Sequence, residues 1–102
     1  MINTMKKLER ILKALANRRR LAILKYLKEN KEASVAEIAY EIDLSFKSTS
    51  KHLGVLSAID IIGKNQRSLQ MFYYLSERYT FIILRILLFD NLLMISNHLF
   101  LF

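Results

Sequence analysis

Hydroxyl and basic side chains gather in the segment Ser45–His52, and their types suit contact with a nucleic acid. Lys47 and Lys51 carry charges that can neutralise phosphates or donate hydrogen bonds to the acceptor atoms of guanine. A solvated helix surface can carry the same two lysines, so the surrounding elements decide between the two readings. The candidate DNA-contacting residues of this segment are Ser45, Phe46, Lys47, Ser48, Ser50, Lys51 and His52.

Lys64 and Arg67 lie in a polar segment, Gly63–Ser68, between two apolar runs. Two strands joined by such a segment form a β-hairpin, and we expect both basic residues to flank its tip. A basic tip beside a DNA-contacting helix would lie over the backbone or the adjacent minor groove, where Arg and Lys are favoured. Lys64 and Arg67 are therefore further candidate DNA contacts.

Amphipathic segments that precede this hairpin are expected to be helices. Met5, Leu8 and Leu12 are separated by steps of three and four residues, which places them in one apolar stripe on a first helix. Asn17 can cap a second helix through its side-chain oxygen, and this helix should end near Asn30, where a polar stretch lies.

A capping box, Ser34 followed by Glu37, predicts the start of a third helix. A turn over residues 43–45 leads to a fourth helix, residues 46–58, which Ser45 is expected to cap. The third and fourth helices together predict a helix-turn-helix over residues 35–58, whose second helix enters the major groove and reaches the bases with its N-terminal residues. We expect the fourth helix to direct four side chains inwards: Phe46, Thr49, Leu53 and Leu56.

The hairpin, residues 61–75, would form a wing, and residues 77–102 a final helix that is apolar nearly all round. Such a helix must be buried on most sides, and a second copy of the chain is the obvious cover. Residues 1–16 and 77–102 are therefore expected to be dimerisation helices. The candidate dimerisation residues are Met5, Leu8, Leu12, Phe81, Leu84, Leu88, Leu92 and Ile95.

Composition supports a small basic domain. The 102 residues suit a single domain, residues 1–102, and the absence of Pro with only two Gly favours helices. Lys and Arg number 16 against 9 Asp and Glu, a net charge of +7 that makes a polyanionic partner a candidate. We expect a mainly α (α+β) fold: about five helices and a two-stranded β-hairpin wing, in a dimer.

Several other classes of protein are not expected. The absence of Cys excludes disulfides and thiolate metal sites and fits a reducing cytoplasm, the expected location. An enzyme is not expected, because there is no Gly-rich phosphate loop, and Ser50 and His52 would point in different directions from one helix. Polar residues such as Arg85 and Asp90 interrupt the apolar C-terminal stretch, so neither a membrane span nor a membrane partner is expected. No cofactor is predicted.

These motifs resemble the arsenic-repressor-like (ArsR/SmtB) family of winged helix-turn-helix regulators. LKALANRRRLAIL (residues 12–24) resembles its second-helix signature, and EASVAEIA (32–39) the start of its third helix. LSFKSTSKHLGVL (44–56) is similar to its recognition helix, and MFYYL (71–75) to the return strand of its wing. The resemblance runs collinearly without gaps over about residues 8–76. It implies a dimer built from the first and last helices, and repression that an effector relieves.

The departures from the family pattern argue against metal sensing. Many metal-sensing members carry a Cys-x-Cys pair where this chain has Ser34 and Ala36, so the soft-metal site is not expected. Other members bind zinc between paired last helices through Asp and His ligands. Asp90 and His98 are eight residues apart with no second His in this helix, too few ligands for a tetrahedral zinc site. We therefore expect the non-metal-sensing branch and no metal.

Three further departures concern the helix ends. Phe46 stands where the family often has a polar base-contacting residue, and it either packs under the turn or contacts a thymine methyl group. Arg18 and Arg19 replace a usual Pro-Thr pair at a helix N-terminus, where a bound anion such as a DNA phosphate would offset their charge. Asp60 replaces a usual Gly and tolerates a left-handed turn.

The sequence therefore predicts a sequence-specific transcriptional regulator, a repressor that binds an inverted-repeat operator in double-stranded DNA as a homodimer. The alternative is a winged helix that has become a protein-protein interaction module; Phe46 favours it and the basic recognition helix argues against it. Association of the last helix with a membrane surface is disfavoured by its few basic residues and the lack of one polar face. No residue pattern identifies an effector.

Overall fold

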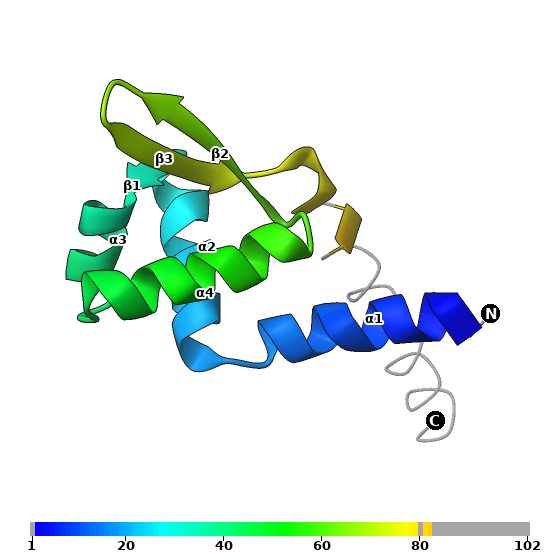
Figure 1. Cartoon of the computed structure of the whole chain (residues 1–102). Coiled ribbons are helices and arrows are strands. Elements are labelled where there is room, and N and C mark those ends of the chain that lie inside the picture. Colours follow the sequence, from blue (N-terminus) through cyan, green and yellow to red (C-terminus); the bar gives the residue numbers. More distant parts are fainter. Residues whose placement is uncertain (1, 80, 83–102) are drawn as a thin grey trace, which may run out of the picture.

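The computed structural model describes residues 2–79, 81 and 82. Residues 77–79, 81 and 82 are helical and follow seven named elements. Figure 1 shows the three strands together on one side of the helices, with α4 crossing α2 and α1 extending away from the sheet. The expected helices and hairpin wing are therefore confirmed for this part of the chain. The elements are α1 (Ile2–Leu15), α2 (Arg18–Asn30), β1 (Glu32–Ser34), α3 (Val35–Glu41), α4 (Phe46–Ala58), β2 (Ile62–Arg67) and β3 (Gln70–Leu75).

Side-chain caps explain where three of the helices begin. The Asn17 side chain accepts hydrogen bonds from two backbone amides in the first turn of α2. Ser34 and Glu37 form the expected capping box of α3, with both hydrogen bonds 3.2 Å long. The Ser45 hydroxyl accepts a 3.1 Å hydrogen bond from the first turn of α4. All three predicted caps are confirmed.

The core lies between α2, α3, α4 and the sheet, and its largest members have almost no exposed surface. Thr49, Leu53 and Leu56 of α4 are fully buried, as predicted. Burial of each large aliphatic side chain stabilises the fold by roughly 1.5–3 kcal/mol. The inward orientation predicted for Phe46 is wrong, because 61% of this residue is exposed. Phe46 is the first residue of α4. The largest fully buried aliphatic residues are Ile23, Leu27, Ile38, Leu53, Leu56 and Ile61.

The sheet has three antiparallel strands in the order β1-β3-β2, one more than the predicted hairpin. Ala33 of β1 pairs with Tyr73 of β3. A three-residue strand is too short to show an alternating pattern, which is why the sequence did not reveal it. Because β1 leads directly into the Ser34 cap, it joins the wing to the helix-turn-helix.

The hairpin turn is shorter than predicted. The polar segment expected at the tip continues β2 as far as Arg67, which pairs with Gln70, so only Ser68 and Leu69 form the turn. Lys64 therefore lies within the strand, opposite Tyr73, and does not flank the tip. Polar residues suit β2 because it is an edge strand with mostly exposed side chains.

Two aspartates occupy left-handed turns at the ends of helices. Asp43 lies between α3 and α4 with φ 53°, and Asp60 follows α4 with φ 61°. The short polar side chain of Asp tolerates this conformation better than most residues do. The conformation predicted for Asp60 is therefore confirmed, and the tight turn at Asp43 brings α4 against α3.

The apolar stripe of α1 is largely uncovered in the single chain. Met5, Leu8 and Leu12 are 59%, 39% and 44% exposed, and Phe81 near the described end is 69% exposed. The other predicted dimerisation residues, Leu84, Leu88, Leu92 and Ile95, lie outside the described residues, as do Asp90 and His98. Within the described ranges, no helix combines the length and apolar character needed to cross a membrane.

The close approach of Gly63 to Tyr74 generates a first prediction. A Cβ atom on Gly63 would lie 2.5 Å from Cζ of the Tyr74 ring, so Gly63→Ala must displace the ring. We expect a loss of about 1 kcal/mol in the free energy of unfolding, measured by chemical denaturation. Gly54→Ala is the matched control: it has open space on helix α4 and should stabilise by up to about 1 kcal/mol. In a Tyr74→Ala background Gly63→Ala should cost nothing; an unchanged cost there would contradict this contact.

The buried hydroxyl of Thr49 generates a second prediction. This side chain has no exposed surface, and its Oγ1 finds no hydrogen-bond partner among the described residues. Thr49→Val replaces the hydroxyl by a methyl group of similar shape, and should raise the free energy of unfolding by about 1 kcal/mol. Thr49→Ser keeps the hydroxyl and removes a methyl group, so it should destabilise. Thermal melts of the three proteins test this, and a less stable valine variant would contradict it.

Candidate nucleic-acid interface

The helix-turn-helix presents the outer side of α4 to solvent. Burial of Thr49, Leu53 and Leu56 on one side leaves Lys47 and Lys51 exposed on the other. The two lysines are four residues apart and therefore lie on the same side of the helix. The sequence of α4 contains no acidic residue to neutralise them. The structure thus brings both predicted lysines to one accessible surface.

The three candidate serines differ in their surroundings. Ser45 is exposed, but its hydroxyl already accepts the capping hydrogen bond from the amide of Ser48. Ser48 and Ser50 are half-buried on opposite flanks of α4. Both hydroxyls can reach only groups that approach along the sides of the helix. Ser45 therefore caps α4 and also lies exposed at the N-terminal end of this helix.

Phe46 extends the accessible surface at the N-terminal end of α4. Its exposure removes one of the two readings that the sequence allowed, packing under the turn. Tyr40 on α3 is even more exposed, at 84%. The start of α4 therefore offers an apolar side chain next to Lys47.

His52 is held against the start of α2 by an arginine. The guanidinium Nη1 of Arg20 lies 3.3 Å from Nδ1 of His52. Because Arg is always a donor, Nδ1 must accept, which leaves the ring neutral with its proton on Nε2. Partial burial, together with the positive charges of Arg20 and Arg19, lowers the pKa of His52, in agreement with a neutral ring. The sequence made His52 a candidate DNA contact but gave no sign that Arg20 would be its partner.

Arg20 also joins α1 to α2. Its Nε donates to the carbonyl of Ala14, and its Nη2 to that of Lys13 at 3.4 Å. These carbonyls belong to the last turn of α1, which lacks intrahelical donors. Arg20 therefore connects α1, α2 and α4 through one side chain, a role that the sequence reasoning missed.

On the wing, the two predicted basic residues have different environments. Lys64 is exposed in the middle of β2. Arg67 forms an ion pair with Glu32 of β1, and its guanidinium lies 4.0 Å from the centre of the Phe72 ring. These contacts hold the Arg67 side chain across the sheet, with about half of its surface still exposed. The strand β1, absent from the sequence prediction, supplies this carboxylate.

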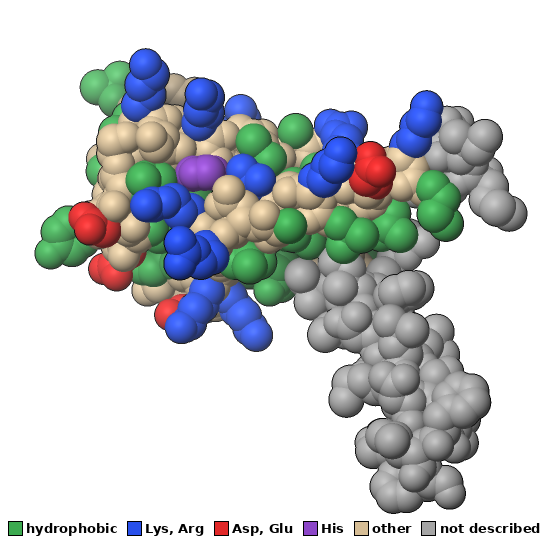
Figure 2. Space-filling view, turned by 90° about the horizontal axis from the view of Figure 1, so that it is seen from below, with side chains coloured by type: hydrophobic (Ala, Val, Ile, Leu, Met, Phe, Trp, Pro, Cys, Tyr) green, Lys and Arg blue, Asp and Glu red, His purple; other side chains and the backbone are tan. Residues whose placement is uncertain are grey.

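Basic side chains continue from α4 onto α2. Figure 2 shows Lys and Arg side chains on both sides of the histidine, which is His52 because His98 lies outside the described residues. Arg18 and Arg19 are exposed at the start of α2. Neither forms an ion pair with any residue that the structure describes. The basic surface is therefore wider than the recognition helix.

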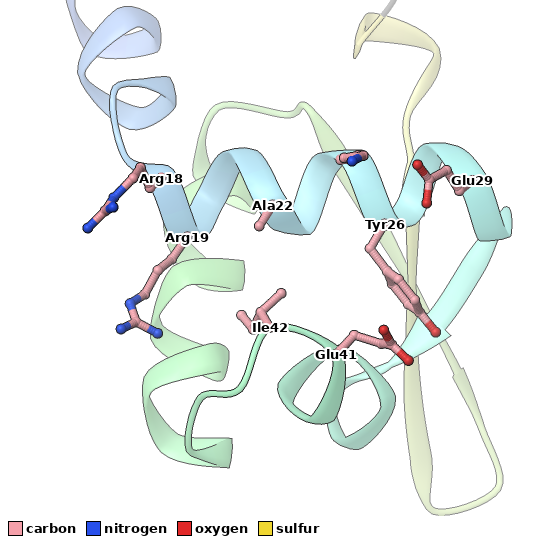
Figure 3. Close-up of a pocket in the computed structure, with 8 residues that line it drawn as sticks. Arg18, Arg19, Ala22, Tyr26, Glu29, Glu41 and Ile42 are labelled. Carbon is pink, nitrogen blue, oxygen red and sulfur yellow. The ribbon is translucent and has the colours of Figure 1, made fainter.

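A hollow beside this surface has mixed charge. Figure 3 shows Arg18 and Arg19 at one end and Glu29 and Glu41 toward the other. Burial, then the carboxylates of Glu37 and Glu41, raise the pKa of Tyr26, which lines the hollow. No pair of groups suited to nucleophilic catalysis lines it. Across the described residues, no three His, Cys, Asp or Glu side chains gather as metal ligands.

Comparison with known proteins agrees with this geometry. Residues 15–62 match the family model of a helix-turn-helix domain. The transcriptional activator HlyU of Vibrio cholerae is 39% identical over 67 residues, which are 66% of this chain and 61% of that protein. The matched region thus spans less than two thirds of this curated relative.

Solved structures extend the similarity to most of the chain. Reduced HlyU from Vibrio cholerae gives a TM-score of 0.70 at 35% identity, over 90% of this chain and 94% of that chain. A homodimeric winged helix-turn-helix DNA-binding domain from Mycobacterium bovis shares the fold, with a TM-score of 0.74 at 24% identity over 90% of this chain and 86% of its own. With its motifs in the same order and HlyU similar over nearly its whole structure, the chain belongs to the arsenic-repressor-like (ArsR/SmtB) family of winged helix-turn-helix transcriptional regulators.

Proposed function

We propose that this protein is a sequence-specific regulator that binds double-stranded DNA with α4 in the major groove. The observation that carries this proposal is the division of α4 into a fully buried side and an outer side with Lys47 and Lys51. A helix held in this way can enter a groove without disturbing the core. The net charge of +7 favours association of the protein with a polyanion such as DNA.

The residues of α4 have different proposed tasks. Lys47 lies nearest the N-terminal end, the end that meets base edges, and is proposed to read a base. Lys51 lies one turn further along and is proposed to contact phosphate. The exposed ring of Phe46 can contact a thymine methyl group, which is an apolar mark in the major groove. Ser45, Ser48 and Ser50 complete the proposed contacts of this helix.

The wing is proposed to contact the DNA backbone. The hairpin turn and the N-terminal end of α4 both lie on the side of the molecule away from the free end of α1 (Figure 1). Lys64 is exposed on β2 and can reach a phosphate directly. Arg67 is proposed to contact DNA while Glu32 and Phe72 hold its side chain in place. The ion pair lowers its net attraction for phosphate, so Lys64 should contribute more.

The active form is proposed to be a homodimer built on α1 and the C-terminal helix. The exposed stripe Met5, Leu8 and Leu12 would otherwise leave apolar surface in water. Figure 2 shows hydrophobic side chains along the arm that α1 forms. A two-fold dimer would recognise an inverted repeat, with half-sites about 34 Å apart. The related Mycobacterium bovis domain is itself homodimeric.

We propose cytoplasmic repression without a metal cofactor. The hydroxyl of Ser34 is already the cap of α3, and Ala36 offers no ligand atom at all. HlyU of Vibrio cholerae is an activator. A transcription assay with the selected operator placed over a promoter therefore tests whether this protein represses or activates transcription. Addition of zinc should not release the DNA.

A protein-interaction module is the second candidate, and the exposed aromatic rings of Tyr40 and Phe46 favour it. The two readings differ in their dependence on salt. Binding through phosphate contacts weakens steeply as salt rises, whereas an apolar protein interface does not.

Removal of the two recognition-helix lysines tests the proposal. Lys47→Ala should reduce discrimination between an operator selected from random DNA and a scrambled duplex, since losing a base contact costs about 1–3 kcal/mol. Lys51→Ala should weaken binding to both duplexes alike, and the slope of log affinity against log salt concentration should become shallower by about one. The double variant should lose specific binding. Fluorescence anisotropy at several salt concentrations measures all three.

The matched control removes two lysines from exposed positions of α2, Lys25→Ala with Lys28→Ala. It changes the net charge equally and should keep most of the discrimination. Circular dichroism verifies that each variant is folded. A folded Lys47, Lys51 double variant that binds operator as tightly as the parent would show that α4 is not the reading element and would favour the interaction module.

The dimer is tested by a charge in the α1 stripe. Leu12→Glu places a carboxylate among Met5 and Leu8, where burial against a second copy would be strongly unfavourable. Light scattering at micromolar concentration should give twice the 12.0 kDa chain mass for the parent and a mass near one chain for the variant. Lys7→Glu puts the same side chain on α1 outside the stripe and should stay dimeric. A monomeric parent with a cooperative melt would rule the dimer out.

A further inference from the structure

We propose that Arg19 and the Nε2–H of His52 together bind one DNA backbone phosphate beside the recognition helix, and that Arg20 is the positioning residue that orients His52. This phosphate site rests on the proposed DNA-binding function and widens its footprint from α4 to the start of α2. The sequence suggested only an anion near Arg18 and Arg19 at the helix N-terminus; the contact of Arg20 with His52 adds a second, oriented donor on α4.

The ring of His52 is prepared as a hydrogen-bond donor. Arg20 occupies its Nδ1, so the proton lies on Nε2, and no hydrogen-bond partner of Nε2 is found among the described residues. Arg20 is itself tied to the carbonyls of Ala14 and Lys13 and cannot follow a ligand outwards. The half-buried ring is therefore held in one orientation with one nitrogen able to donate.

Arg19 supplies the charge that a single neutral donor lacks. It is exposed, and among the described residues its side chain forms neither an ion pair nor a hydrogen bond. Its positive charge lies near enough to His52 to lower the pKa of the ring. The guanidinium of Arg binds phosphate oxygens strongly and with defined geometry. A cation and a neutral donor with a fixed tautomer together suit a phosphate diester, which accepts from both.

The location of the pair matches the path of a DNA strand. His52 lies one turn after Ser48, so these two residues share one flank of α4, next to the outer side that carries Lys51. Figure 2 shows basic side chains on both sides of the histidine over this part of the surface. A helix in the major groove is bordered by phosphates along its sides. Arg19 and His52 lie at such a border.

The first test compares Arg19→Ala with Lys25→Ala by fluorescence anisotropy. Each variant removes one exposed positive charge from α2. On a duplex selected from random DNA and on its scrambled control, Arg19→Ala should weaken binding roughly tenfold in both cases. The slope of log affinity against log salt should become shallower by about 0.9, the value for one phosphate on B-DNA. Lys25→Ala should keep the parental slope.

The second test separates the two nitrogens of His52. His52→Gln keeps a donor near the position of Nε2 and should retain most of the affinity. His52→Asn keeps a polar group near the position of Nδ1 for Arg20 but loses the outer donor. It should therefore bind DNA as weakly as Arg19→Ala does. The double variant with both substitutions should bind no more weakly than either single variant. In Arg20→Ala, the nitrogen chemical shifts of the His52 ring should show a mixture of the two tautomers. Arg20→Lys should rescue the protein, with a thermal melt like that of the parent.

The outcomes distinguish this proposal from the function on which it rests. A parent that binds neither duplex would overturn both. A parent that binds while Arg19→Ala and Lys25→Ala have the same slope would overturn the phosphate site and leave the role of α4 intact. A histidine whose Asn and Gln variants bind equally well would also overturn it, because its outer nitrogen would then make no contact.

Discussion

Leu53 and Leu56 of α4 share one fully buried cluster with Ile23 and Leu27 of α2 and Ile38 of α3. Their burial is roughly proportional to the apolar area removed from water, and it fixes the rotation of α4 about its own axis. Once that rotation is set, the lysines of α4 have only one direction in which to point. The surface available to DNA is therefore a consequence of the packing on the opposite side of the same helix.

The junction between α1 and α2 is a second point on which the surface depends. Asn17 satisfies two amides at the start of α2, and Arg20 satisfies carbonyls at the end of α1. The same Arg20 side chain then reaches His52 of α4. A short polar connection thus supplies hydrogen-bond partners at two helix ends and sets the orientation of the His52 ring on α4. This coupling places α2 beside the proposed DNA path.

The wing has an analogous arrangement. Arg67 at the end of β2 is held by Glu32 of β1 and lies over Phe72 of β3, so one side chain contacts all three strands. A single ion pair at a half-exposed site contributes little to stability. Its value here is to restrict the direction of a long flexible side chain. The exposed apolar stripe of α1 is not satisfied within one chain, which is why the family resemblance and the surface both point to a second copy.

Local signals in the sequence were sufficient for the helices and their beginnings. Asn17, Ser34 with Glu37, and Ser45 act on amides within three residues of themselves, so the caps could be recognised without any knowledge of the fold. The family resemblance covered the helix-turn-helix and the wing in order. The periodicity of α4 also placed Lys47 and Lys51 on the outer side.

Only the tertiary structure decided the features that join residues far apart in the chain. The strand β1 exists because β3 offers it a partner some forty residues later, and polar β2 is a strand because it lies at a sheet edge. Phe46, the first residue of α4, is exposed although its residue type favours burial. The contact of Arg20 with His52 spans 32 residues and depends on how α2 crosses α4. Periodicity and capping report only the local chain, whereas these contacts are set by which surfaces meet when the core closes.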